Sequence, residues 1–258
     1  MICQRCQQFA AATPEGLCSL CAAAPQGPPP VPVTSPHGPA WLRSPVGLGT
    51  AVALLIGLAI ATDLFAVWAD LRMRDVTASI ADGDYSDSLQ REAEDADSVY
   101  LAAGYAQTVS FLAAVVVYLV WFQRTRVNAE VFNPFGHSKK RAWAVWSWFV
   151  PVVSLWFPRR IMLDIWDASR PLTARGSHGL VNAWWTLWIF ALITDRFAFS
   201  RYSRAGTPDE ILAAMDQVLL ADVADIAAGV LAILVVLRLT RMQNEKAHQG
   251  RAPLPVNV

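Results

Sequence analysis

The recurrence of long apolar segments with almost no charge constrains this chain more than any other feature. Residues 46–69 contain one charged side chain, residues 101–122 contain none, and residues 218–237 contain two. A helix needs about 20 consecutive apolar residues to cross the hydrocarbon core of a bilayer. Each of these segments is long enough, so the sequence predicts an all-α integral membrane bundle.

Two further apolar segments lie between the second and the third of these. Residues 180–199 are apolar except for a charged pair near their end, which we expect to reach the membrane surface. Residues 142–158 are rich in Trp and have Pro151 near the middle, which is typical of a re-entrant or interfacial segment. The sequence therefore predicts four transmembrane helices, one re-entrant or interfacial segment, and an amphipathic helix over residues 159–170.

The signs of the charges in the connecting segments predict the orientation of the chain. Residues 123–141 hold five basic side chains against one acid, whereas residues 70–100 hold nine acids against three arginines. Lys and Arg are enriched in the cytoplasmic loops of membrane proteins. We therefore expect residues 123–141 on the cytoplasmic side, residues 70–100 and 195–217 in outer loops, and both termini in the cytoplasm.

The charge balance and the missing motifs exclude several classes of protein. Lys plus Arg and Asp plus Glu are 21 each, which excludes a strongly basic nucleic-acid binder. The chain has no GxSxG, HExxH or Walker sequence, and its four histidines are scattered over the predicted linker, loops and tail. We therefore expect neither an enzyme nor a nucleic-acid partner.

All four cysteines fall within residues 1–23, in two CxxC pairs separated by eleven residues. Two such pairs place four thiolates around one tetrahedral zinc ion, and Gly16 can supply the turn before the second pair. Four sulfur ligands leave no open coordination position, so we expect a structural zinc-ribbon-like module. A dithiol redox pair and an empty site are the alternatives. The predicted ligands are Cys3, Cys6, Cys18 and Cys21.

Residues 24–45 contain eight of the sixteen prolines, which is typical of an extended, semi-rigid linker. A docking site for a proline-binding domain at residues 29–32 is the alternative. The membrane domain then covers residues 46–242, and residues 243–258 are predicted to form a flexible cytoplasmic tail.

Three carboxylates interrupt the predicted transmembrane helices. Asp222 and Asp225 lie on one face of a helix, and Asp63 lies at a comparable depth in the membrane. Charged groups are energetically unfavourable within a membrane, so these residues predict a cation or proton site. The alternative is that all three lie near the headgroups, hydrated or paired with nearby arginines.

Eight of the eleven tryptophans fall between residues 143 and 188. Tryptophan favours the membrane interface, where its ring is apolar and its N–H finds a partner. We therefore expect these side chains to anchor the protein in the membrane rather than to stack on a ligand. The basic run at residues 139–141 suits the anionic cytoplasmic leaflet.

A pattern of spaced residues runs through the same region, formed by Arg126, Asn128, Trp143, Trp148, Pro151, Pro158, Asp164 and Trp166. This pattern resembles an actinobacterial family of membrane proteins that is known as domain of unknown function 4328. The resemblance covers residues 46–242, and the two prolines are its most specific part. It implies a helical domain in a bacterial plasma membrane, often preceded by a cysteine-containing segment, and it implies no activity.

Two functions of different class fit this sequence. The first is a non-enzymatic scaffold or regulatory protein that docks a cytoplasmic protein partner through the zinc module. The second is a small transporter or channel component that uses the three aspartates for a cation or a proton. Small residues at every fourth position from Gly49 to Ala61 favour close helix packing, in a compact bundle or a homo-oligomer.

Overall fold

The computed structural model describes residues 12–17, 19, 22, 33–171 and 177–249. The chain divides into two compact units, residues 1–32 and residues 33–258, and the second holds the helices and strands described below. In the first unit, Gly16 has a φ of 74°, the conformation predicted for the turn before the second CxxC pair. The predicted zinc ligands Cys3, Cys6, Cys18 and Cys21 lie outside the described residues.

Three long helices dominate the second unit and are long and apolar enough to cross a membrane. The shortest has 36 residues and, at about 1.5 Å per residue, is about 54 Å long. A hydrocarbon core is about 30 Å thick, so each helix is longer than one membrane span requires. The three are α2 (Val46–Ala81), α3 (Asp87–Phe132) and α7 (Pro208–Gln249).

Residues 70–100, predicted as an outer loop, are helical on both sides of a short turn, so α2 and α3 form a helical hairpin. Both helices continue to a short turn at residues 82–86, where Gly83 has a φ of 87°. Ser86 caps α3 by accepting a hydrogen bond from Leu89 N at 3.4 Å. The sequence analysis missed these helical extensions because charged side chains end an apolar run without ending a helix, whose solvated surface accommodates them.

Residues 142–158 form no continuous helix but reverse direction at a tight turn. Val152 lies at its centre with a φ of 67° and a ψ of −52°, and Val153 N donates a hydrogen bond to Pro151 O at 2.7 Å. This is a γ-turn with positive φ, a rare and strained conformation for a β-branched residue. The surrounding elements are α4 (Trp143–Trp146), the short helix η1 (Val153–Leu155) and α5 (Phe157–Ser169).

Residues 33–45, predicted as part of an extended linker, instead belong to the helical unit. The strands β1 (Val33–Ser35) and β2 (Gly38–Ala40) pair antiparallel, with Val33 opposite Ala40. Ser35 is buried and bonds to Glu130 on α3, 95 residues away in the sequence. The linker prediction was wrong for residues 33–45. Proline content indicates local stiffness of the chain, but it does not indicate a contact with a residue as distant in the sequence as Glu130.

The last helix also extends into the segment predicted as a flexible tail from residue 243. α7 continues to Gln249, and Gln243 and Lys246 on it donate hydrogen bonds to α5 and the residue that follows α5. These contacts hold the last turns of the helix in place. Residues 250–258 lie outside the described part of the chain.

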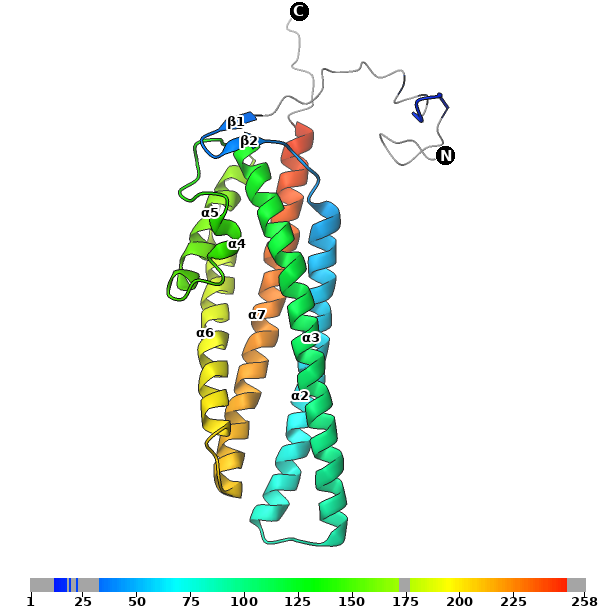
Figure 1. The fold of residues 1–258 in the computed structure, drawn as a ribbon, viewed down its shortest axis with the longest axis vertical. Helices are drawn as coiled ribbons and strands as arrows, with labels where there is room; N and C mark the ends of the chain where they lie inside the picture. Colours follow the sequence, from blue (N-terminus) through cyan, green and yellow to red (C-terminus); the bar gives the residue numbers. More distant parts are fainter. Residues whose placement is uncertain (1–11, 18, 20–21, 23–32, 172–176, 250–258) are drawn as a thin grey trace, which may run out of the picture. The chain divides into compact units, whose positions relative to one another are not determined.

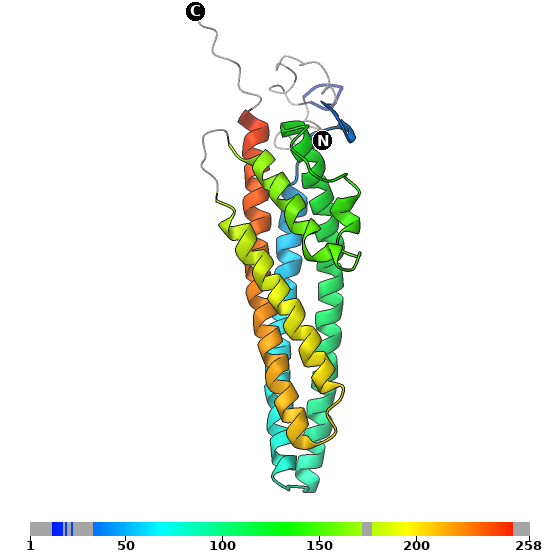
Figure 2. The same cartoon turned by 90° about the vertical axis from the view of Figure 1, so that its left-hand side faces the viewer.

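The helices are arranged side by side, with α2 packed along both α3 and α7, and α6 (Gly179–Tyr202) packed along α7 (Figure 1). The beginning of α2, the ends of α3 and α7, α5 and both strands lie at one end, which we call the network end. The turns at residues 82–86 and 203–207 lie at the opposite end, which we call the turn end (Figure 2).

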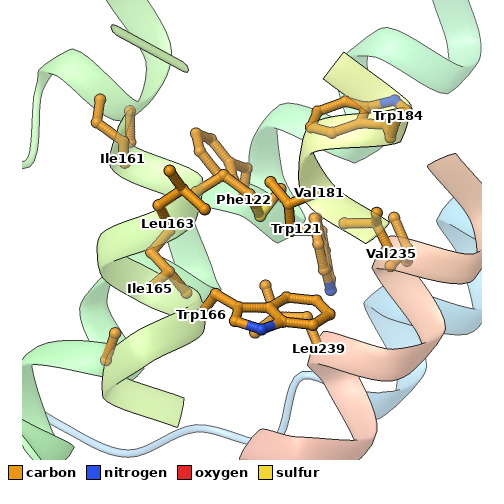
Figure 3. Packing of buried hydrophobic residues seen from close by; sticks show 14 of the residues in the cluster. Trp121, Phe122, Ile161, Leu163, Ile165, Trp166, Val181, Trp184, Val235 and Leu239 are labelled. Atoms are coloured by element: carbon orange, nitrogen blue, oxygen red, sulfur yellow. The ribbon is translucent and has the colours of Figure 1, made fainter. Parts of the chain in front are cut away.

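The main core lies toward the network end and is rich in aromatic side chains (Figure 3). Trp121 from α3, Trp166 from α5 and Trp184 from α6 are all buried in it. Trp166 and Trp184 were predicted to be interfacial anchors, but neighbouring helices cover both of them. Trp146 and Trp156 are 62% and 50% exposed and remain compatible with a position at the membrane interface.

Candidate functional site

Two of the three predicted aspartates are joined by an amide from a third helix. Gln107 Nε2 on α3 donates hydrogen bonds to Asp63 Oδ1 on α2 at 3.1 Å and to Asp222 Oδ1 on α7 at 3.3 Å. An amide nitrogen carries two hydrogens, so this geometry uses one of them on each carboxylate. All three side chains are partly buried. α2, α3 and α7 are thereby connected at one polar point.

A further member, Asp70, is absent from the residues predicted for this site. It is 3% exposed and lies two helical turns after Asp63 on α2. The carboxyl groups of Asp70 and Asp222 lie next to each other, and Oδ2 of each is buried without a hydrogen-bond partner among the described residues. The seven-residue spacing from Asp63, which places both on one helix face, is the signal that could have identified Asp70. We call Asp63, Asp70, Gln107 and Asp222 the Asp–Gln cluster.

Asp225 does not join this cluster. It lies three residues after Asp222 on α7, but its side chain is exposed and makes no hydrogen bond within the described ranges. Pairing with nearby arginines is not seen either. Among residues 33–171 and 177–249, no ion pair includes Asp63, Asp222 or Asp225.

Small side chains surround the Asp–Gln cluster. Ala66, Ala69 and Ala103 form a buried group between α2 and α3, and the hydroxyl oxygens of Thr62 and Ser110 are 2.8 Å apart.

Two carboxyl groups hydrogen-bond to each other only when one of them holds a proton. In the part of the chain that the structure describes, no group of three or more His, Cys, Asp or Glu side chains is arranged to hold a metal ion. The cluster therefore offers two neighbouring carboxyl groups that can share one proton.

A second buried polar group surrounds Glu130 at the network end. Arg126 Nη1 is 2.5 Å from Glu130 Oε1, and Arg141 also pairs with this carboxylate. Ser35 Oγ donates to Glu130 Oε2 at 2.9 Å. Burial alone would raise the pKa of Glu130, but the hydrogen bonds from Arg141 and Ser35 and the charges of both arginines lower it overall. Arg126 Nη2 also donates to Lys139 O at 2.8 Å, which holds the loop after α3.

Asn128 and Gln243 extend these contacts to other elements. Asn128 accepts a hydrogen bond from Arg43 N at 2.9 Å and donates to Arg43 O at 2.7 Å and to Gln243 Oε1 at 3.1 Å. Gln243 Nε2 donates to Thr125 O at 2.9 Å and to Ser169 Oγ at 3.1 Å. The contacts connect the segment before α2 with α3, α5 and α7. We call all these residues around Glu130 and Asn128 the Glu130 network.

Several residues of the sequence pattern support the chain around this network. Arg126 and Asn128 belong to it. Asp164 on α5 accepts hydrogen bonds from Ser138 N at 2.9 Å and from Ser138 Oγ at 2.6 Å, which fastens the loop after α3 across α5. Trp166 is buried in the core, with the guanidinium of Arg238 5.6 Å from its ring centre.

The remaining pattern residues shape the segment that contains the γ-turn. Trp148 packs edge-on against Tyr118 of α3 and Trp188 of α6, with ring centres 5.4 and 5.6 Å apart. Trp143 packs edge-on against Phe157 at 5.3 Å. Pro158 is buried in the first turn of α5, and Pro151 is exposed at the start of the γ-turn. All eight pattern residues thus lie at or near the network end, and none belongs to the Asp–Gln cluster.

The chain belongs to the family described as "Domain of unknown function (DUF4328)", whose model matches residues 84–241. The matched region runs from the start of α3 into the last turns of α7, so it includes Gln107, Asp222 and Glu130. Asp63 and Asp70 precede it. No curated protein and no solved structure shows significant similarity to the chain.

Proposed function

We propose that this protein is a proton-coupled transporter or channel component, in which the Asp–Gln cluster takes up and releases a proton within the membrane. The observation that carries the proposal is the pair formed by Asp70 and Asp222, neighbouring carboxyls that each keep a buried, unpartnered oxygen. Ionisable groups in membrane segments are unfavourable unless they are paired, and they mark proton and ion pathways in known pumps and transporters.

The Asp–Gln cluster has more hydrogen-bond acceptors than donors, so a bound proton would supply a missing donor. Gln107 supplies two donors, which serve Asp63 and Asp222. No amide or hydroxyl donor among the described residues serves Oδ2 of Asp70 or Oδ2 of Asp222. One proton shared between these two carboxyls supplies the missing donor and removes one negative charge. Its loss leaves two adjacent carboxylates that repel each other, so protonation is coupled to the packing of α2 against α7.

A topology with four transmembrane helices and cytoplasmic termini in a bacterial plasma membrane belongs to the same proposal. α6 has 24 residues, about 36 Å at 1.5 Å per residue, which matches the hydrocarbon thickness and supports a fourth span. The basic residues 139–141 lie just beyond the network end of α3, and the acidic α2–α3 turn lies at the turn end. This asymmetry supports a cytoplasmic network end and an outer turn end.

Proton flux into sealed vesicles tests the proposed function. The full chain is reconstituted into liposomes with an entrapped pH-sensitive dye, and a pH gradient is imposed across the membrane. We expect the flux to fall to the level of empty vesicles in Asp70→Asn and Asp222→Asn. Asp225→Asn is the matched control, because it removes an exposed carboxylate one turn along the same helix, and we expect it to keep the flux. Equal flux in wild type and both cluster variants would overturn the proposal, and sodium or potassium flux without proton flux would identify a cation site instead.

A scaffold function for the cytoplasmic face is a second candidate, favoured by the docking of the β1–β2 hairpin. Ser35 on this hairpin bonds to Glu130, and Arg43 bonds to Asn128, so the segment that follows the cysteines is fastened to α3. A protein bound to the cysteine segment would therefore be held by a chain that is fixed to α3 from residue 35 onward. The proposal includes one structural zinc ion held by Cys3, Cys6, Cys18 and Cys21.

Metal analysis and partner binding test this second candidate. We expect about one zinc per full-length chain, and loss of zinc in a Cys18→Ser/Cys21→Ser variant. Crosslinking in cells should give a specific partner for wild type that is lost in the cysteine variant and retained in Asp222→Asn. Zinc well below one per chain, or a partner that survives the loss of the cysteines, would contradict it.

A further inference from the structure

An open pocket of about 340 Å³ lies beside the first turn of α5. Three of its lining side chains are basic and none is acidic. Two more are aromatic, and the sixth is a serine. The lining residues are Ser138, Lys139, Trp156, Phe157, Arg159 and Arg160, which we call the α5 pocket.

Two of the three basic side chains form no ion pair within the described ranges, and the third forms only a long one. Arg159 donates through Nη2 and Nε to Asn182 Oδ1 at 2.8 and 3.2 Å, and this partner is uncharged. Lys139 Nζ lies 4.1 Å from the ring centre of Phe157, and it forms no ion pair within the described ranges. Arg160 has only a loose ion pair with Asp164, with its Nε 3.5 Å away, and its side chain is 60% exposed. The pocket therefore keeps an excess of positive charge.

The loop and the helix that form the pocket are fixed to each other. Asp164 on α5 accepts hydrogen bonds from the backbone N–H and from the hydroxyl of Ser138, which directly precedes Lys139. The pocket also lies at the beginning of α5, a helix of 13 residues whose N-terminal dipole adds positive potential. Loop, helix and dipole thus present positive charge to the same space, which is the usual requirement for binding a phosphate group.

The surface next to the pocket is apolar. The γ-turn segment that leads into it carries large apolar side chains that are 43% to 62% exposed, namely Trp146, Phe149, Val152, Leu155 and Trp156. Tryptophan in such a position is typical of the membrane interface. A phospholipid offers both a phosphate for the basic pocket and acyl chains for this apolar surface, whereas a free phosphate ion would use only the first.

We propose that the α5 pocket binds the phosphate of an anionic phospholipid headgroup from the cytoplasmic leaflet, with the acyl chains lying along residues 146–156. The proposal rests on the orientation given under the proposed function, but not on the proton chemistry of the Asp–Gln cluster. Lipid binding at this place ties α5 and the loop after α3 to the membrane surface. Those two elements also carry the contacts of Asp164 and Arg141 that hold the network end together.

Native mass spectrometry of the full chain in detergent tests the proposal. Wild type is titrated with dioleoylphosphatidylglycerol, with dioleoylphosphatidylcholine and with inorganic phosphate. We expect one phosphatidylglycerol to bind most tightly. Each basic side chain near an anionic headgroup contributes about fivefold in affinity, so Lys139→Gln/Arg160→Gln should weaken this binding about 25-fold. Arg159 is left intact because its bonds to Asn182 contribute to the fold.

A charge-matched variant separates this pocket from general surface attraction. Lys140→Gln/Arg241→Gln also removes two basic charges from the same end of the molecule, but neither residue lines the pocket. We expect this control to bind phosphatidylglycerol within about twofold of wild type. Equal weakening in both double variants, or equal affinity for the zwitterionic lipid, would overturn the proposal. Displacement of the lipid by an equal concentration of inorganic phosphate would show a free-phosphate site and would overturn the lipid assignment. The flux assay under the proposed function is independent of each of these results.

Discussion

The two ends of the bundle bury carboxylates in opposite ways. At the network end, Glu130 receives two arginines and a serine hydroxyl, so both of its oxygens have partners. Toward the turn end, Asp70 and Asp222 lie next to each other and each keeps an oxygen without a partner. A buried carboxylate with complete partners stabilises one arrangement of the chain, whereas one that lacks a donor responds to a proton. The comparison indicates that the partners of Glu130 stabilise the network end, and it is the basis for the proposal that the Asp–Gln cluster binds a proton.

The side chains packed around the Glu130 network are larger than those packed around the Asp–Gln cluster. The network end has a core of large aromatic side chains, including Trp121, Phe122 and Trp166. The buried group beside the Asp–Gln cluster consists of Ala66, Ala69 and Ala103, and the group nearer the turn end is a small aliphatic one without aromatic side chains. Small side chains make fewer dispersion contacts, so helices joined by them separate or slide at a lower energy. The proposed protonation site therefore lies where small side chains join the helices.

Removal of the Glu130 side chain should have the largest effect on stability. Glu130→Ala leaves Arg126 buried with no carboxylate and deprives Arg141 of its ion pair. Breaking a buried ion pair by removing one partner is strongly destabilising, so we expect a loss of about 3–5 kcal/mol in the free energy of unfolding. Chemical unfolding in detergent, followed by tryptophan fluorescence, measures it. A loss below about 1 kcal/mol would show that the network end is not the stabilising end.

A side chain at Gly49 should have the next largest effect, because α2 and α7 are in close contact there. A Cβ at Gly49 would collide with the Thr240 hydroxyl, which also accepts a hydrogen bond from Trp121 Nε1 at 3.0 Å. We expect Gly49→Ala to lower the free energy of unfolding by about 1–3 kcal/mol. Gly57→Ala is the control, since nothing lies within 4 Å of its Cβ position, and a similar loss in both variants would contradict the packing explanation.

The pH dependence of stability should distinguish Glu130 from a merely polar residue. The folded protein lowers the pKa of Glu130 from its ordinary value of 4.5, so the ionised carboxylate stabilises the fold above that pH. This contribution is lost as the pH falls through the lowered pKa. We expect wild type to exceed Glu130→Gln in melting temperature at pH 7, and the difference to shrink on acidification below about pH 4. A difference that stays constant between pH 7 and pH 3 would contradict the ion-pair account.

The smallest expected effect has the opposite sign and concerns Asp70. Asp70→Asn provides an amide donor beside Asp222 and removes one of two adjacent acids. We expect the free energy of unfolding to rise by about 1 kcal/mol at neutral pH, because the amide makes the hydrogen bond that the wild-type pair makes only after it takes up a proton. Asp225→Asn should change it by less than about 0.5 kcal/mol, because that side chain is exposed. A destabilised Asp70→Asn would mean that Asp70 already has a strong partner.

The parts of this structure that the sequence predicts are those that depend on composition over about 20 residues. The apolar runs within α2, α3 and α7 identify three helices that can cross a membrane. The pattern of spaced residues that includes Pro151 and Pro158 identifies the family. The helical hairpin of residues 70–100 and the extension of α7 past residue 242 were missed, because a helix continues wherever it finds packing or solvent partners and not only where it is apolar.

The candidate site shows the same limit at the level of single residues. Asp63 and Asp222 attract attention because each interrupts an apolar run, whereas Asp70 follows such a run and reads as the start of a loop. The bridging role of Gln107 depends on helix packing that brings residues 44 and 115 positions apart in the sequence into contact, and no local pattern reports this. Periodicity likewise cannot say whether a tryptophan faces lipid or a neighbouring helix, so Trp166 and Trp184 were assigned to the wrong environment.

Infrared spectroscopy of the full chain in lipid tests the central claim most directly, because a protonated carboxyl has a carbonyl band that ionised carboxylates and amides lack. At neutral pH we predict this band in wild type and in Asp225→Asn, and its loss in both Asp70→Asn and Asp222→Asn. A wild-type spectrum without the band, or a band that persists in both cluster variants, would contradict a proton shared between Asp70 and Asp222.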